Sequence, residues 1–216
     1  EFQQIGEFTN SLTIQKRLRG VWQHHQNVSY CFFGSKKHLM ENIFQNRRMP
    51  FYQFGEMLHL KCIPTEYWVP FICSRFEKYG KKITEEYAGR ICQVVKNYSS
   101  YVQQLAWNVM AETEKEVNEQ SFKEGLKALL EQNSSLFIQQ TEGLTTYQLN
   151  FIRLLCKDIH TGFTTKAVSE IYPLGSKSNV DRIKKCLIEK EIITIEKDGV
   201  SLADSVFELW FKREMM

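Results

Sequence analysis

A small polar turn followed by cations stands directly after an apolar run near the start of the sequence. Residues 28–33 are Val-Ser-Tyr-Cys-Phe-Phe, and Gly34, Ser35, Lys36 and Lys37 follow at once. The run predicts a buried strand, and ligands of α/β sheets bind beyond the carboxyl ends of the strands. Ser35 and the two lysines are therefore candidate ligand-binding residues. The alternative is a plain strand-to-helix turn in which Ser35 caps a helix and the lysines lie in solvent.

A second group of candidate residues is basic and lies near the C-terminus. Basic side chains on a recognition helix contact the phosphates and base edges of DNA. The segment expected to form such a helix and the turn after it carry Lys177, Arg182, Lys184, Lys185 and Lys197. Acidic neighbours such as Asp181 and Glu189 reduce the net positive charge, so the basic residues alone do not predict DNA binding.

Other residue patterns give less information about function. His24 and His25 have no Cys or acidic residue at metal-ligand spacing, and we expect no metal site. The six cysteines form no C-x-x-C pair, and four lie in apolar runs. They predict buried, reduced thiols in a cytoplasmic protein. No apolar run approaches the roughly 20 residues of a membrane span, and we expect no membrane partner.

The bulk composition is that of a globular protein. The chain has 216 residues, of which 43% are hydrophobic and 25% charged, with a net charge of +3. This length fits one large domain or two small ones. The nearly balanced charge requires neither nucleic acid nor a membrane.

The elements that must position these residues are mostly helices. Apolar spacing and capping residues predict helices over residues 1–20, 36–45, 66–79, 84–95, 100–112, 121–130, 145–155, 167–171, 178–187 and 205–212. Capping boxes are expected at Ser121-x-x-Glu124 and Thr145-x-x-Gln148. A second short strand is expected near Met57–Cys62.

Near the C-terminus, "IITIE" and "VSLAD" alternate about an Asp-Gly turn and predict a β-hairpin. Three helices followed by a hairpin are the pattern of a winged helix.

Three segments together resemble the signal-transduction (STAND) ATPases of the AAA+ group, in particular the archaeal-type ATPases that are also widespread in bacteria. They are "EFQQI" at the start, "FFGSKKHLM" and "RRMPFYQFGEMLHLKCI". In that family an apolar strand ends in Asp-Glu followed by Phe-Gln. A second strand ends in Gly-Ser with a basic residue, and a Pro-Phe-Tyr segment, a helical lid and a winged helix follow.

The resemblance implies roles for individual residues. Glu1 matches the Walker B glutamate, which orients or polarises the attacking water. Ser35 matches the sensor residue beside the γ-phosphate, and Lys36 or Lys37 would add positive charge near the phosphates. The family's phosphate-loop motif, G-x-x-x-x-G-K-[ST], does not occur in the sequence. The lid turn also departs from the family, because Asn97-Tyr98-Ser99-Ser100 replaces a Gly-x-Pro turn near the adenine base.

We therefore expect a mainly α fold with a remnant of a parallel α/β sheet. The expected domains are an ATPase-core remnant over residues 1–64, a helical lid over 65–140 and a winged helix over 141–216. The expected function is the C-terminal portion, beginning at the Walker B glutamate, of an ATPase that uses ATP and Mg²⁺ when intact. The portion itself would be inactive and hold no cofactor.

Two further expectations concern partners. The alternative function is a non-enzymatic winged-helix regulator that binds DNA, whereas in the family the winged helix often makes a regulatory contact within the protein. The strand at residues 28–33 would lack its neighbours in the sheet, so self-association through this strand is also expected.

Overall fold

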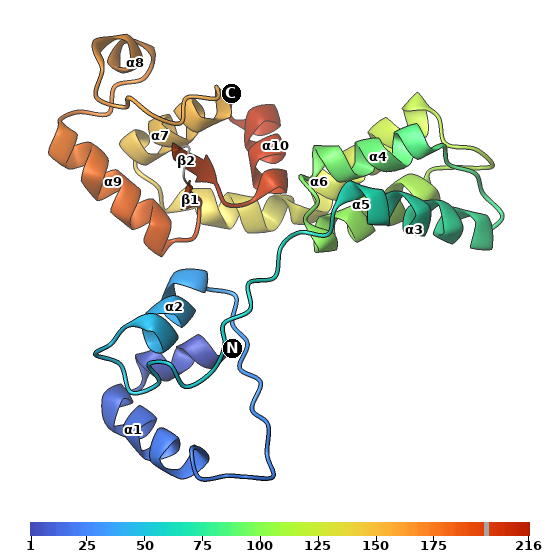
Figure 1. Ribbon diagram of the computed structural model, residues 1–216. Helices are drawn as coiled ribbons and strands as arrows, with labels where there is room; N and C mark the ends of the chain where they lie inside the picture. Colours follow the sequence, from blue (N-terminus) through green and yellow to red (C-terminus); the bar gives the residue numbers. More distant parts are fainter. Residues whose placement is uncertain (197–198) are drawn as a thin grey trace. The chain divides into compact units, whose positions relative to one another are not determined.

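The structure, a computed structural model, describes residues 1–196 and 199–216. It is mainly α-helical, as the sequence predicts, and its described strands form a single two-stranded sheet (Figure 1). The chain divides into two compact units, Glu1–Lys61 and Cys62–Met216. The three-domain division expected from the sequence stays a prediction. No described helix is long and apolar enough to cross a membrane.

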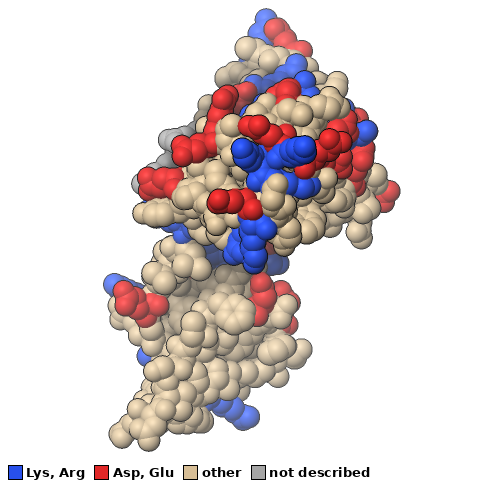
Figure 2. Space-filling view, turned by 90° about the vertical axis from the view of Figure 1, so that its right-hand side faces the viewer, with Lys and Arg blue, Asp and Glu red and all other residues tan. Residues whose placement is uncertain are grey.

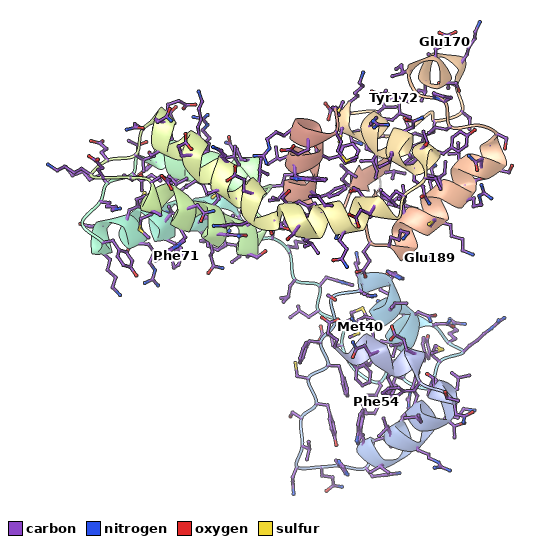
Figure 3. All side chains as sticks on the ribbon, turned by 180° about the vertical axis from the view of Figure 1, so that it is seen from behind. Met40, Phe54, Phe71, Glu170, Tyr172 and Glu189 are labelled. Carbon is purple, nitrogen blue, oxygen red and sulfur yellow. The ribbon has the colours of Figure 1, made fainter. Side chains whose placement is uncertain are left out.

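Aromatic packing holds the first unit together. Its elements are the 3-10 helix η1 (Phe2–Glu7), α1 (Ser11–Trp22) and α2 (Lys37–Gln45). Its core consists of Ile5, Ile43, Phe44 and Phe51, with Met40 and Phe54 (labelled in Figure 3) among the side chains packed around it. The single helix predicted for residues 1–20 is wrong. The chain turns at Asn10, whose φ of 64° lies in the left-handed region that Asn tolerates.

The strands predicted at Val28–Phe33 and near Met57–Cys62 are both wrong. Neither segment belongs to a strand in the described structure. Phe33 is 71% exposed and Leu60 is 90% exposed, and Cys31 and Cys62 are exposed rather than buried. An apolar run becomes a strand only where a neighbour supplies hydrogen-bond partners along its length. The described residues supply one backbone bond to the first run, from Phe2 N to Phe33 O, and none to the second.

The second unit begins with four helices: α3 (Thr65–Lys78), α4 (Glu85–Val94), α5 (Ser99–Ala111) and α6 (Glu119–Glu142). As predicted, Thr84 caps α4 by accepting a hydrogen bond from the backbone N–H of Tyr87. The cap predicted for α6 at Ser121 is misplaced. Asn118 is the N-cap, and Ser121 closes the capping box from inside the helix. The long helix α6 runs from this group to the C-terminal elements (Figure 1).

The C-terminal elements follow the predicted order. They are α7 (Thr146–Cys156), α8 (Lys166–Ile171), α9 (Lys177–Glu189), β1 (Ile193–Glu196), β2 (Gly199–Leu202) and α10 (Ser205–Glu214). The hairpin is confirmed, because β1 and β2 pair antiparallel with Ile193 opposite Leu202. The capping box of Thr145 and Gln148 is confirmed as well. Helix α9 begins after Ser176 rather than at the predicted Ser178.

Helix α10 is fastened to the turn between α4 and α5. The buried Ser205 hydroxyl donates to the carbonyl oxygen of Val95 at 2.9 Å. The Tyr101 hydroxyl donates to a carboxylate oxygen of Asp204 at 2.5 Å. Lys96 Nζ lies 2.7 Å from Glu208 Oε2. These contacts join segments about a hundred residues apart into one packed body.

Candidate functional site

Glu1 and Ser35, the two candidate catalytic residues, lie in direct contact in the first unit. The Ser35 hydroxyl donates a hydrogen bond to Glu1 Oε2 over 2.8 Å. Gln3 Nε2 donates to the same carboxylate oxygen and lies 3.5 Å from Ser35 Oγ. No side chain of the described residues donates a hydrogen bond to the other oxygen, Glu1 Oε1. Side chains thus hold one carboxylate oxygen, and the exposed carboxylate can still accept a hydrogen bond from a water molecule or ligand.

Backbone pairing and ring packing bring these residues together. The N–H of Phe2 donates to the carbonyl of Phe33 at 2.9 Å. The Phe2 ring lies 4.4 Å from the Phe32 ring and 5.5 Å from the buried Phe51 ring. Because Phe2 and Phe32 are fixed in one aromatic core, the flanking residues Glu1 and Ser35 are placed side by side.

Gln3 is a site residue that the sequence analysis missed. Its side chain is 2% exposed, and its Oε1 is buried without a partner among the described residues. A Cβ atom at Gly34 would lie 2.0 Å from that oxygen and 2.8 Å from Met40 Sδ. Gly34 therefore makes room for Gln3 beneath Glu1. The available signal was the Phe-Gln that follows the glutamate in the resembling family, to which no role was given.

The carboxylate of Glu1 is stabilised in its charged form. The hydrogen bond from Ser35, and next the one from Gln3, hold the pKa of the Glu1 carboxyl below its ordinary value of 4.5. At neutral pH this site therefore presents an exposed anion beside a neutral hydroxyl. Such a pair is suited to orienting a water molecule by accepting a hydrogen bond from it.

Ser35 does not cap α2, so that alternative is wrong. Lys36 occupies the N-cap position without a side-chain cap bond, whereas the Ser35 hydroxyl points to Glu1. Lys37 Nζ lies 3.8 Å from Glu41 Oε1, one turn along the helix. Lys36 is half-buried. Phosphate binding by the two lysines stays a prediction.

Some of the basic side chains of α9 are engaged in contacts within the protein, and others are exposed. Lys184 is half-buried, with its Nζ 4.9 Å from the centre of the Phe163 ring. The guanidinium of Arg182 donates to Asn179 Oδ1 at 2.9 Å. Lys177 and Lys185 are exposed, and Lys197 lies outside the described residues. Acidic side chains share the helix, including Glu189 at its end (labelled in Figure 3). DNA binding by α9 stays a prediction.

Within residues 1–196 and 199–216, no three His, Cys, Asp or Glu side chains cluster closely enough to hold a metal ion.

Arg19 has a structural role in the first unit. Arg19 donates to the backbone carbonyls of Pro50 and Tyr52 and stacks over Phe54 at 5.5 Å. It therefore fastens α1 to the loop that follows α2.

No protein-family model matches the sequence, and no curated protein matches it. Among solved structures, the chain is similar to the Walker-type ATPase Paby2304 of Pyrococcus abyssi, with a TM-score of 0.73 and 12% sequence identity. The similarity covers 97% of this chain and 61% of that structure. The chain therefore shares its fold with part of a Walker-type ATPase.

Proposed function

We propose that this chain is the C-terminal portion of an AAA+-like signal-transduction ATPase that binds and hydrolyses ATP. The observation that carries the proposal is the hydrogen bond between Ser35 and Glu1 at 2.8 Å. The family resemblance assigns these two residues, 34 positions apart, to the same step of phosphoryl transfer. Their contact supports that assignment, and so does the shared fold with a Walker-type ATPase.

In this proposal Glu1 orients the attacking water through its exposed carboxylate. Ser35 and Gln3 hold one oxygen, so that the carboxylate keeps one orientation and stays ionised at neutral pH. By the family resemblance, Ser35 is the residue that senses the γ-phosphate. Mg²⁺, bound with ATP, would neutralise the charge that develops on the phosphates. Residues outside these 216 are expected to supply the phosphate loop and the magnesium-binding aspartate.

The C-terminal elements are proposed to act as a winged helix that makes a regulatory contact. The support is the set of bonds that tie α10 to the α4–α5 turn, among them Tyr101 with Asp204 and Ser205 with Val95. These bonds couple α10 to the α4–α5 turn, and two arrangements of the lid and winged helix would follow the nucleotide state.

The test is Glu1→Gln in the full-length protein. The variant should still bind nucleotide but lose most of its turnover, because an amide cannot serve as the base that the carboxylate provides. Glu7→Gln, at an exposed position of η1, is the matched control and should keep full turnover. Undiminished hydrolysis by Glu1→Gln would remove Glu1 from the role.

The isolated 216-residue chain should not hydrolyse ATP. Positioning and charge stabilisation make up nearly all of phosphoryl-transfer catalysis, and the sequence holds no phosphate-loop motif. Magnesium-dependent phosphate release above a blank by the purified chain would contradict this part of the proposal.

A further inference from the structure

The second unit carries a groove that no step of the proposed function uses. It has a volume of about 940 Å³ and lies between one face of α3 and the segment that leads into α4. The α3 wall comes from Glu66, Pro70, Ser74 and Glu77, which recur at helical spacing. The opposite wall comes from residues 81–85 and Glu116.

The floor of the groove is apolar. Val69, Cys73 and Ile83 lie half-buried along it. Pro70, which stands inside α3 and lines the groove, adds an apolar ring to the wall. The groove thus offers a surface on which an aliphatic side chain can pack.

Four carboxylates line this groove: Glu66, Glu77, Glu85 and Glu116. All are exposed, and none forms an ion pair with a described residue. Of the two lysines on the rim, Lys81 directs its Nζ to the carbonyl of Met110 at 2.8 Å. The groove therefore carries net negative charge. Acidic and basic side chains intermingle on the face of this unit seen in Figure 2.

The wall that carries Glu116 is held in place by the backbone. Lys82 pairs with Glu116 in an isolated parallel bridge, with hydrogen bonds of 2.7 Å from Lys82 N to Lys115 O and 2.9 Å from Val117 N to Lys82 O. This bridge joins the segment before α4 to the segment before α6. The backbone that carries Glu116 is thus held beside the segment that leads into α4.

We propose that this groove binds a protein segment in which arginine or lysine flanks an aliphatic side chain. The carboxylates only accept hydrogen bonds, and guanidinium and ammonium groups only donate them. The apolar floor takes the aliphatic side chain between the cations. The phosphates of nucleic acid or of an anionic membrane would meet four carboxylates and be repelled.

This interaction goes beyond the proposed function and does not depend on it, because no groove residue belongs to the Glu1–Ser35 site. Its failure would leave the ATPase proposal untouched, and the reverse also holds.

The probe is a panel of labelled synthetic peptides in which arginine or lysine flanks leucine, isoleucine or phenylalanine. Binding to the 216-residue chain is measured by fluorescence anisotropy at two salt concentrations. At least one peptide should bind, more weakly at high salt because exposed charges are screened. Peptides with glutamate in place of the basic residues should not bind. If no basic peptide binds, the proposal is overturned.

The decisive variant is Glu77→Lys/Glu116→Lys. These positions are exposed, and a lysine in the last turn of α3 suits the helix dipole, so folding should be preserved. Affinity should fall by roughly tenfold or more, because two attractions become repulsions. Glu131→Lys/Glu142→Lys makes the same charge change on α6, outside the groove, and should bind like the wild type. Equal losses in both variants would overturn the proposal.

A second variant, Ser74→Trp, fills the groove without altering its charge. It should weaken binding as much as the charge reversal does, and unchanged affinity would place the peptide elsewhere. Light scattering distinguishes a second copy of this chain as the occupant. If the wild type self-associates and Glu77→Lys/Glu116→Lys does not, the groove is an interface between copies and the proposal for a separate partner is overturned.

Discussion

At the scale of single residues, Gln3 and Gly34 depend on each other. Gly34→Ala would place a Cβ atom 2.0 Å from Gln3 Oε1, and the 2%-exposed glutamine has no free space into which to move. We expect the first unit to lose about 1–3 kcal/mol of unfolding free energy. In Gln3→Ala/Gly34→Ala the clash with Gln3 is gone and the 2.8 Å approach to Met40 Sδ remains, so the two losses should be less than additive.

The measurement is urea unfolding followed by the NMR signal of the Trp22 indole, the tryptophan of residues 1–61. Gly55→Ala is the control, because no atom lies within 4 Å of its Cβ position, and it should change stability little. Additive losses in the double variant would show that Gly34 does not serve Gln3.

A second residue-scale prediction concerns the charge of Glu1. Ser35→Ala removes the largest cause of the lowered pKa, so the pKa of the Glu1 carboxyl should rise toward 4.5. Because the folded-state pKa lies below the unfolded one, the contact stabilises the protein above about pH 4.5. This stabilisation fades as the pH falls through the folded-state pKa. A ¹³C-carboxyl NMR titration checks it, with exposed Ser29→Ala as the control; an unshifted titration would contradict the contact.

The sequence could predict part of this site. Glu1 and Ser35 stood in motifs of a known family, and the structure brings them together. Gln3 stood in the same motif as Glu1 but had no role assigned to it, because a glutamine is usually exposed and nothing local marks one that is buried under a neighbour's carboxylate. The role of Gly34 was equally hidden, since the residue that it accommodates is 31 positions away.

At the scale of elements, the close packing of α5 on α6 depends on Gly125. A Cβ atom there would lie 2.7 Å from the backbone N and Cα of Val109. Gly125→Ala should therefore destabilise the second unit by about 1–3 kcal/mol. Gly89→Ala, inside α4 with its nearest atom at 4.0 Å, should instead stabilise it by about 0.5–1 kcal/mol, because alanine is the better helix former. Thermal unfolding of both variants checks the prediction, and equal effects would refute it.

Most helices could be predicted because their signals are local. The caps at Thr84 and Thr145 depend on residues within one or two turns of each other. The predicted N-caps of α6 and α9 lay two or three residues after the observed ones. Asn118 and Ser176 take the cap position, for which nearby serines were equally suitable by residue type. The strand predicted for residues 28–33 was wrong for the opposite reason. A strand depends on a partner strand, and a local pattern contains no information about that partner.

At the scale of the whole molecule, the segment 28–33 is an open surface. Phe33 and Val28 are 71% and 53% exposed. The described structure gives the backbone of this segment a single hydrogen bond, from Phe2 N to Phe33 O. Exposed apolar residues with open backbone groups are a template for pairing with another chain. Self-association through this segment is therefore expected at raised concentration.

The check is the mass of the 216-residue chain by light scattering over a range of concentrations. The wild type should rise above the 25.5 kDa of one chain, whereas Val28→Lys/Phe33→Lys should not, because charges on an open edge oppose pairing. Leu12→Lys/Val21→Lys is the matched control: its side chains are 51% and 56% exposed, but they lie on α1, whose backbone groups are paired within the helix. If the control variant abolishes association equally, exposed apolar side chains in general, and not the unpaired backbone of segment 28–33, drive the association. If the wild type stays at 25.5 kDa throughout, this segment is stable in solvent without a partner.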